Sequence, residues 1–454
     1  YEFTVEPGVA ERWTVSDDGL TYTFHLREDA AWSNGEPVTT RDFVESWRQA
    51  MMIDLSPPYY MYLMFIDGAE DYREWTQDSL ERVRAIEDPQ ARQTAATERI
   101  KDAWEKFNQL VAVDAPDERT LTLRLARPVP YFLECIACWP FMPVHRTVRA
   151  DYVVSPETAM LQRNDAWTRA DEVISNGPYR LTDWQFKQHI LLERNEHYWN
   201  NDPASFDRVR LVNFQAHDTA YEAYDRGEID LVIGTSVKFL PDLVQANRSD
   251  VHAVNNFGTY YYALNTRPKL NDDSPNPLAD VRVRQALVMS VDKQPIVEKV
   301  TRLNQDIADT FIPHGSIPGY TPGRGLPYDV DAARRLLAEA GHPNGEGLGP
   351  LVLSYNTETP YHEAVALAVG RMWEQKLGLT IEFKPYSWKE FIAVRSRGDF
   401  FIARSGWFGD YGDPTTFLDL PKTGDGNNDA GFTDPKYDAM LAETYDGDPR
   451  SFEG

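Results

Sequence analysis

Helical and extended segments alternate in the second half of this 454-residue chain, and no other sequence feature limits the fold as much. Apolar residues at helical spacing predict helices within 278–300 and over 331–340 and 362–377, the last closed by Gly378. An extended segment over 379–383 follows directly. Such alternation is typical of a parallel or mixed sheet covered by helices, so we expect an α/β fold.

The first half mixes short strands with helices. Alternating apolar residues predict strands over 21–27 and 120–126, and Asp17-Asp18-Gly19 predicts a hairpin turn before the first strand. Thr39 or Thr40 can cap a helix that runs from Arg41 toward Met51. The stretch 79–110 predicts exposed helix broken near Pro89. Further along we expect strands over 190–193, 209–214 and 229–233, and a short helix over 221–227.

Charge and composition exclude several classes of protein. The chain carries 46 Lys and Arg against 71 Asp and Glu, a formal net charge of −25. Nucleic acid or anionic lipid as the main partner would need a basic surface instead. Hydrophobic residues make up 42%, which is ordinary for a globular protein, and no apolar run approaches a membrane span of roughly 18 residues. The length suits about three domains of roughly 150 residues each.

Motifs for catalysis or metal binding are nearly absent from the sequence. The nine His residues are scattered, and neither a Gly-x-Ser-x-Gly elbow nor a phosphate-binding glycine loop occurs, so we expect no metal and no cofactor. Cys135 and Cys138 have the spacing of a redox motif, which needs a cysteine at a helix N-terminus after a strand. The surrounding residues favour two packing cysteines, and a thiol redox enzyme stays an alternative.

The segment from Phe400 to Pro414 is the most unusual in the chain. An apolar run ends at Arg404, and a Gly406-Trp407 pair and an acidic, glycine-rich turn with Asp410 follow. This order predicts a strand end that delivers these side chains to a crevice, where open α/β folds bind ligands. Gly406 and Gly409 would let the backbone approach a ligand. A solvated turn with a satisfied ion pair is the alternative.

Several separated blocks of sequence carry a resemblance to a known family. They are Pro7 to Trp13, Asp18 to Arg27, Trp32 to Thr39 with Asp42-Phe43-Val44, Pro128 to Phe132, Asn176 to Tyr179, Tyr224 to Asp230, Asp280 to Leu287, and Gly406 to Pro414. In these blocks and their order the chain resembles the peptide- and oligopeptide-binding members of the family 5 extracellular solute-binding proteins of ABC transporters.

The resemblance implies a two-lobed periplasmic-binding-protein clamp (type II) with an additional domain. Residues 1–142 would form the extra domain, 143–257 the central part of lobe I, and 258–454 lobe II. The region 75–110 looks like an expansion relative to the family. Because the opening and closing strands of lobe I are missing, we expect the printed sequence to omit residues that exist in the molecule.

The resemblance also implies site residues, carried over by motif. Asp410 would pair with the α-ammonium group of a peptide, while Arg404 and His362 would meet ligand carboxylates. Trp388 and Trp407 match aromatic walls of side-chain pockets, although an ordinary core role is the alternative for Trp388 and Tyr59. The further binding residues are Gly406, Asn176, Tyr59 and Tyr261. Thr301, followed by Arg302, stands where the family has a Lys, which favours peptides longer than dipeptides. Phe408 stands where the family has a Cys, so a family disulfide is absent.

The function that the resemblance implies is capture and handover, with no catalysis. We expect a monomer in the periplasm or at the outer face of the cytoplasmic membrane, with a lipid anchor left open. It would bind short peptides of about three residues or longer, close near Phe257, and deliver them to a membrane permease. An oligosaccharide is an alternative cargo, haem is another that the family takes, and nickel is disfavoured because no His-rich pocket is evident.

Overall fold

The computed structural model describes residues 4–57, 59–150, 152–163, 165–201, 206–233, 238–252, 254–303 and 305–446. They divide into two compact units, one of residues 4–214 with 445–446 and one of residues 215–444. The domain boundaries that the family resemblance implies, at about 142 and 257, stay a prediction.

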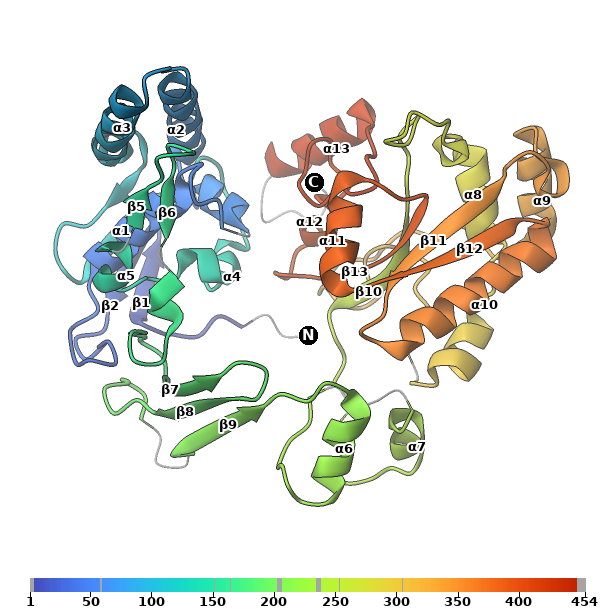
Figure 1. Cartoon of the computed structure of the whole chain (residues 1–454), viewed down its shortest axis with the longest axis horizontal. Helices are drawn as coiled ribbons and strands as arrows, with labels where there is room; N and C mark the ends of the chain where they lie inside the picture. The colour runs from blue at the N-terminus through green and yellow to red at the C-terminus, as the bar shows by residue number, and fades with distance from the viewer. Residues whose placement is uncertain are drawn as a thin grey trace. The chain divides into compact units, whose positions relative to one another are not determined.

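The unit of residues 4–214 contains an antiparallel sheet that confirms the strands predicted near the N-terminus (Figure 1). Its spatial order is β1 (Ala10–Val15), β2 (Thr21–Leu26), β4 (Thr120–Arg124) and β3 (Val113–Asp114). Gly19 takes a left-handed φ of 70° in the predicted turn. The predicted helix is α1 (Thr40–Met51), whose Asp42 accepts the Thr39 N–H at 2.9 Å and so fixes the helix start.

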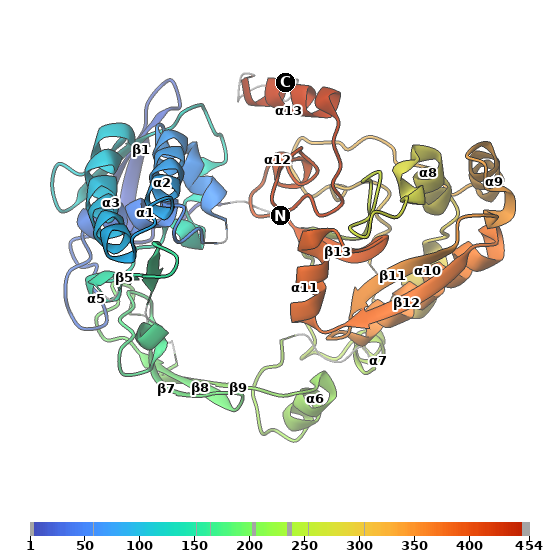
Figure 2. The ribbon, with the colours of Figure 1, turned by 45° about the horizontal axis from the view of Figure 1, so that its top comes forward.

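Two long helices, α2 (Ala69–Arg84) and α3 (Pro89–Leu110), pack side by side in Figures 1 and 2. The predicted break near Pro89 is confirmed, and Asp88 caps α3 by accepting the Ala91 N–H at 2.7 Å. The prediction of exposed helix is wrong for the inner faces, because Leu80, Ala96 and Phe107 are buried. Polar residues on the outer faces dominate the composition of both helices, so composition alone did not reveal the apolar inner faces.

A three-stranded antiparallel sheet of β7 (Tyr179–Gln185), β8 (His189–Arg194) and β9 (Arg208–Val212) confirms two further predicted strands. A hairpin of β5 (Tyr152–Val154) and β6 (Leu161–Arg163) contacts α3.

The strand predicted over 229–233 is wrong. No described strand pairs with this segment, and Leu231 and Ile233 are 74% and 88% exposed, so apolar residues in a short run do not by themselves make a strand. The remaining elements of the unit of residues 4–214 are η1 (Tyr60–Phe65), α4 (Phe132–Cys135), η2 (Trp139–Phe141), α5 (Arg146–Ala150) and η3 (Asp165–Thr168).

The unit of residues 215–444 is built on a mixed sheet in the order β10 (Gly258–Leu264), β13 (Ile402–Phe408), β11 (Pro350–Asn356) and β12 (Thr380–Tyr386). β11 runs parallel to β12 and β13, while β10 is an antiparallel edge strand. A large apolar core joins one face of the sheet to α8 (Val281–Met289), α9 (Val330–Glu339) and α10 (Pro360–Leu377). The opposite face packs on α11 (Trp388–Arg397). The predicted helix-covered mixed sheet is therefore confirmed (Figure 1).

The predicted helices of this unit are confirmed with small shifts at their ends. α10 ends where Gly378 takes φ 71°, a left-handed conformation that glycine adopts without strain. Within 278–300, α8 stops at Met289 and a separate π-helix, η5 (Ile296–Thr301), follows. The other elements are α6 (His217–Asp225), α7 (Leu240–Gln245), η4 (Pro277–Ala279), η6 (Pro343–Gly345), α12 (Thr415–Leu418) and α13 (Pro435–Asp446).

Candidate functional site

The ladder between β10 and β13 determines which of the predicted binding residues share a face of the sheet. Tyr262 pairs with Arg404 and Tyr260 pairs with Gly406. Because side chains alternate along a strand, these four positions lie on one face, the face that packs toward α10. The sequence analysis expected Arg404 at a strand end, but β13 continues to Phe408 and Arg404 lies in its middle.

Arg404 is a cation with no acidic partner among the described residues. Its guanidinium carbon lies 5.0 Å from the centre of the Tyr260 ring. Its Nε is buried and has no hydrogen-bond partner in the described part of the chain, and no described carboxylate lies within ion-pair distance of it. The side chain as a whole is half-buried. A half-buried cation without a described carboxylate beside it is suited to an anion supplied by a ligand.

His362, in the first turn of α10, adds a neutral hydrogen-bonding group beside this cation. The side chain is 3% exposed, and its ring lies 5.6 Å from the Tyr260 ring, centre to centre. Burial and then the nearby Arg404 charge lower the pKa of His362 to about 3, so the ring is neutral at pH 7. The Tyr260 oxygen and Nδ1 of His362 are 3.3 Å apart.

The charge state of Tyr260 follows from the same surroundings. Burial raises the pKa of Tyr260 to about 12, although the Arg404 charge opposes this, so the phenol stays protonated. When the Tyr260 hydroxyl donates to Nδ1, the one proton of the neutral imidazole sits on Nε2 and can be donated further. A guanidinium beside such a donor is a chemically sound receptor for a carboxylate.

Tyr261 and Trp407 lie on the opposite face of the ladder from Arg404. Tyr261 pairs with Ser405 and Thr259 pairs with Trp407. The Tyr261 ring packs edge-on against Phe311 at 5.0 Å, and burial raises its pKa. The sequence analysis placed these residues together with Arg404 in one site, and strand alternation separates their side chains.

Asp410 follows β13 in a loop that main-chain hydrogen bonds to neighbouring segments stabilise. The Asp410 N–H donates to Oγ1 of Thr416 at 2.9 Å, and the Gly409 N–H donates to the Phe257 carbonyl at 2.7 Å. A side chain at Gly409 would place its Cβ 2.1 Å from the Phe257 ring, so this glycine serves that packing. At Gly406 the nearest atom would be 3.4 Å away, so packing of the chain itself does not require glycine there. The ligand role predicted for Asp410 stays a prediction.

Trp388 begins α11 and is 48% exposed, which does not fit the alternative of an ordinary core aromatic. Its main-chain N–H, at the start of the helix, donates to Oε1 of Glu358 at 2.6 Å. Glu358 also accepts from Nδ2 of Asn356 at 3.0 Å. The sequence analysis missed Glu358 and Asn356, because single polar positions at or beside a strand end carry no periodic signal. It also missed Tyr260 and Tyr262, which lie within β10.

Tyr59 and Asn176 belong to the unit of residues 4–214. Tyr59 takes a left-handed φ of 64°, which is unusual for a bulky residue, and its ring lies 4.8 Å from the Trp139 ring. Asn176 is half-buried in the loop before β7. Thr301 ends η5 and Arg302 takes φ 57°. The binding roles of Tyr59 and Asn176 stay predictions.

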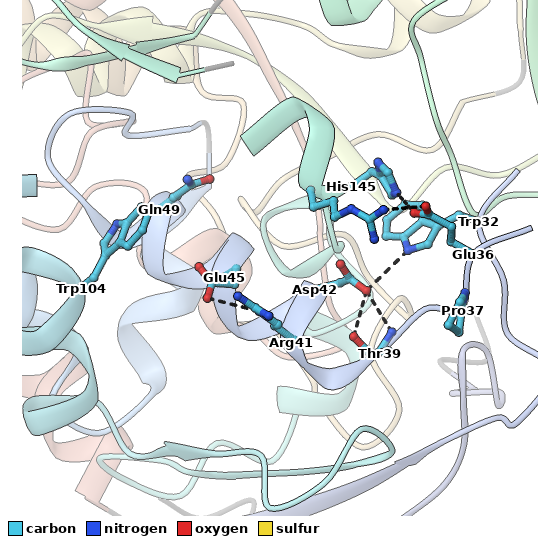
Figure 3. Close-up of a pocket in the computed structure, with 11 residues that line it drawn as sticks. Trp32, Glu36, Pro37, Thr39, Arg41, Asp42, Glu45, Gln49, Trp104 and His145 are labelled. Carbon is cyan, nitrogen blue, oxygen red and sulfur yellow. Dashed lines mark hydrogen bonds and ion pairs between the residues drawn. The ribbon is translucent and has the colours of Figure 1, made fainter. Parts of the chain in front are cut away.

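A pocket of about 460 Å³ also lies in the unit of residues 4–214 (Figure 3). It is lined by Trp32, Glu36, Pro37, Thr39, Arg41, Asp42, Glu45, Gln49, Trp104, His145 and Arg146. Glu36 bonds to Nε2 of His145 at 2.8 Å and accepts from Arg146 at 2.6 Å. These contacts join the loop of 32–37 to the segment 145–146, which indicates a structural role for this part of the family signature.

The redox, metal and membrane expectations can be compared with the described residues. Cys135 is 1% exposed and ends α4, whereas a redox site needs a helix N-terminus. Across the described residues no group of three His, Cys, Asp or Glu side chains could hold a metal ion. Within the same part of the chain, every helix falls short of the length or apolar character that a membrane crossing requires.

Comparisons with known proteins agree with this arrangement. The family model "Bacterial extracellular solute-binding proteins, family 5 Middle" matches residues 4–429. The periplasmic oligopeptide-binding protein OppA of Escherichia coli is 32% identical over 96% of this chain and 73% of its own length.

Solved structures share the fold. The murein tripeptide binding protein MppA of Escherichia coli matches with a TM-score of 0.78 and 28% identity, covering 98% of this chain and 78% of that protein. Haemophilus influenzae OppA in complex with RPPGFSPFR matches with a TM-score of 0.77 and 27% identity, covering 98% and 79%. The predicted fold class, a two-lobed α/β binding-protein clamp with an additional domain, is thereby confirmed. The chain belongs to family 5 of the bacterial extracellular solute-binding proteins.

Proposed function

We propose that this protein captures short peptides outside the cytoplasm and delivers them to the membrane permease of an ABC importer. The peptides would be about three residues or longer and bound in extended form, largely through main-chain hydrogen bonds. Relatives described as oligopeptide- and murein-tripeptide-binding proteins support this cargo.

The observation that carries the proposal is the unpaired Arg404 beside a neutral His362. The guanidinium lacks a described acidic partner, and the imidazole is buried and uncharged. A peptide carboxylate would supply the missing anion and accept from both groups.

The other binding residues complete the proposal. Asp410 would meet the α-ammonium group of the peptide, since a carboxylate is the natural partner of an ammonium ion. Trp407, Trp388 and Tyr261 would contact peptide side chains. In the other unit, Tyr59 and Asn176 would contribute further contacts. Residues 258–454 would then form the lobe that holds both ends of the peptide.

The protein would act by binding alone, as the binding proteins of its family do. We place it in the periplasm or at the outer face of the cytoplasmic membrane, as a monomer. Closure near Phe257 on the bound peptide would present the form that the permease recognises.

Native mass spectrometry of protein purified without added ligand tests this proposal. We expect a set of adducts whose masses, after release, match short peptides of varied sequence. Adducts that resolve into oligosaccharides or another solute would contradict the peptide assignment. A single unliganded mass that stays unchanged after incubation with a tripeptide mixture would contradict it as well.

A further inference from the structure

The chain contains two cysteines, Cys135 and Cys138, and one tight turn joins them. Cys135 is the last residue of α4, and the Cys138 N–H donates to the Cys135 carbonyl at 2.9 Å. A four-residue turn closed by such a bond brings its first and last Cα atoms within about 7 Å of each other. Because a disulfide can join cysteines whose Cα atoms are up to roughly 7 Å apart, the main chain places this pair within reach of one.

The backbone of this turn also directs the two side chains to the same side. Ile136 follows α4 with φ −67° and ψ −16°, values close to those of a 3₁₀-helix. In a turn this tight, side chains three residues apart eclipse one another. The φ of Cys138 fixes its Cβ relative to the preceding chain, and its value of −76° is still near the helical range. Both Cβ atoms therefore lie on one side of the turn.

The two sulfurs differ in their access to solvent. Cys138 is half-buried, whereas Cys135 is buried. A dissolved oxidant can therefore reach the Cys138 sulfur first. Because Cys135 ends a helix and does not begin one, the pair lacks the arrangement of a catalytic redox motif. A bond between these cysteines would be structural.

We propose that Cys135 and Cys138 form an intramolecular disulfide that fixes the turn between α4 and η2. This inference rests on the part of the proposed function that places the protein outside the cytoplasm, because disulfides form and persist in such oxidising compartments. The Cys138 thiolate attacks the disulfide of a small-molecule or protein oxidant, which gives a mixed disulfide and releases one thiol. The Cys135 thiolate then attacks the Cys138 sulfur and releases the second thiol. The two cysteines lose two protons and two electrons, and the oxidant takes them up.

The turn lies between two fixed points of the unit of residues 4–214. On one side Phe132 of α4 is buried, and on the other the buried Phe141 accepts the Trp47 Nε1–H at its carbonyl at 2.8 Å. Between them Trp139 is exposed, and its ring lies 4.8 Å from that of Tyr59. The disulfide holds the start of η2, and with it Trp139, beside this predicted peptide-contact residue.

Mass spectrometry of the purified protein tests whether the bond forms. Protein that has been reduced with dithiothreitol and then freed of it is incubated with reduced and oxidised glutathione, quenched with acid, denatured and alkylated with iodoacetamide. We expect the oxidised monomer to take up no alkyl group, whereas a sample kept in dithiothreitol should take up two. Because the chain has no third cysteine, an unalkylated monomer without glutathione can contain only the bond between Cys135 and Cys138.

The variant Cys135→Ala is the matched control, because it keeps the half-buried Cys138 and removes only the second thiol. We expect it to carry one glutathione after the same treatment, since no neighbouring thiol can resolve the mixed disulfide. Two alkylated cysteines in the oxidised wild-type protein, two glutathione adducts, or a covalent dimer would each overturn the inference.

Hydrogen exchange measures whether the bond fixes the turn. The Cys138 N–H bonds within the turn, and the Phe141 N–H bonds to the Cys138 carbonyl at 3.1 Å. We expect exchange over residues 132–142 to be several-fold slower in the oxidised than in the reduced protein, and exchange over α10 to be equal in both. Equal exchange over 132–142 would contradict the proposed effect on the turn. Neither assay needs a peptide, so a protein that forms the bond but binds no tripeptide contradicts the proposed function alone, and the opposite result contradicts this inference alone.

Discussion

Burial of His362 as a neutral ring makes a specific prediction about acid stability. The pKa of this residue is about 3 in the folded protein and 6.5 for an ordinary imidazole. Above pH 6.5 the ring is neutral in both states. Below it the unfolded chain takes up a proton that the folded protein refuses, so the free energy of unfolding falls as the pH drops from 6.5 toward 3.

The size of this effect follows from the two pKa values. Full titration would remove about 5 kcal/mol of stability, and roughly 2–3 kcal/mol of that is already lost at pH 4.5. Titration of many carboxylates over the same range also changes stability. A comparison with His362→Asn isolates the imidazole, because Asn cannot be protonated here and can still accept from the Tyr260 hydroxyl.

Urea unfolding of both proteins at pH 7.5 and pH 4.5 provides the measurement. We expect the wild-type protein to lose about 2–3 kcal/mol more than His362→Asn between these pH values. Any packing defect of the variant is present at both pH values and cancels. Equal losses in the two proteins would refute the assignment of a buried neutral imidazole at 362.

Three further predictions concern other parts of the molecule. In the buried pair, Arg99 Nη2 lies 2.5 Å from Asp54 Oδ2, and Asp54 also accepts the Leu161 N–H at 2.7 Å. Asp54→Ala should therefore lower the free energy of unfolding, measured in urea, by about 3–5 kcal/mol, because it leaves the Arg99 charge buried without a partner. The double change Asp54→Ala/Arg99→Met should lower it by only about 1–3 kcal/mol. Equal losses in the two variants would contradict the argument that the unpaired Arg99 charge is the main cost. Gly409→Ala should destabilise the fold by roughly 1–3 kcal/mol, because its Cβ would meet the Phe257 ring. Gly406→Ala should leave the thermal midpoint nearly unchanged. A larger loss of stability in Gly406→Ala than in Gly409→Ala would contradict this packing. Asp410→Ala should abolish peptide binding in calorimetry with an unchanged circular dichroism spectrum, and unchanged affinity would remove Asp410 from the site.

Local sequence signals were sufficient for most of the regular elements. The strand over 21–27 and the helix over 362–377 have clear periodicity, a defined turn or cap, and neighbours that let them pack as predicted. The segment 229–233 was also predicted as a strand but pairs with no described strand. Its failure shows that a strand depends on a partner that local sequence does not specify.

The candidate site was only partly predictable for a related reason. Arg404 and His362 were identified from motifs, and the structure brings both to Tyr260. Glu358 and Asn356 are single polar residues whose significance appears only when β11 and β12 are side by side. The separation of Tyr261 from Arg404 follows from the register of β10 on β13, which pairs Arg404 with Tyr262. These two residues are 142 positions apart in the chain, so neither local segment indicates the pairing.

The receptor formed by Arg404 and His362 is the central claim, and one thermodynamic cycle tests it most directly. Calorimetry would compare trialanine with its C-terminal amide on the wild-type protein and on Arg404→Gln. The wild-type protein should bind the free carboxylate more tightly by about 2–5 kcal/mol, and Arg404→Gln should lose most of that difference. Equal binding of the acid and the amide by the wild-type protein, or an undiminished difference in Arg404→Gln, would contradict the account.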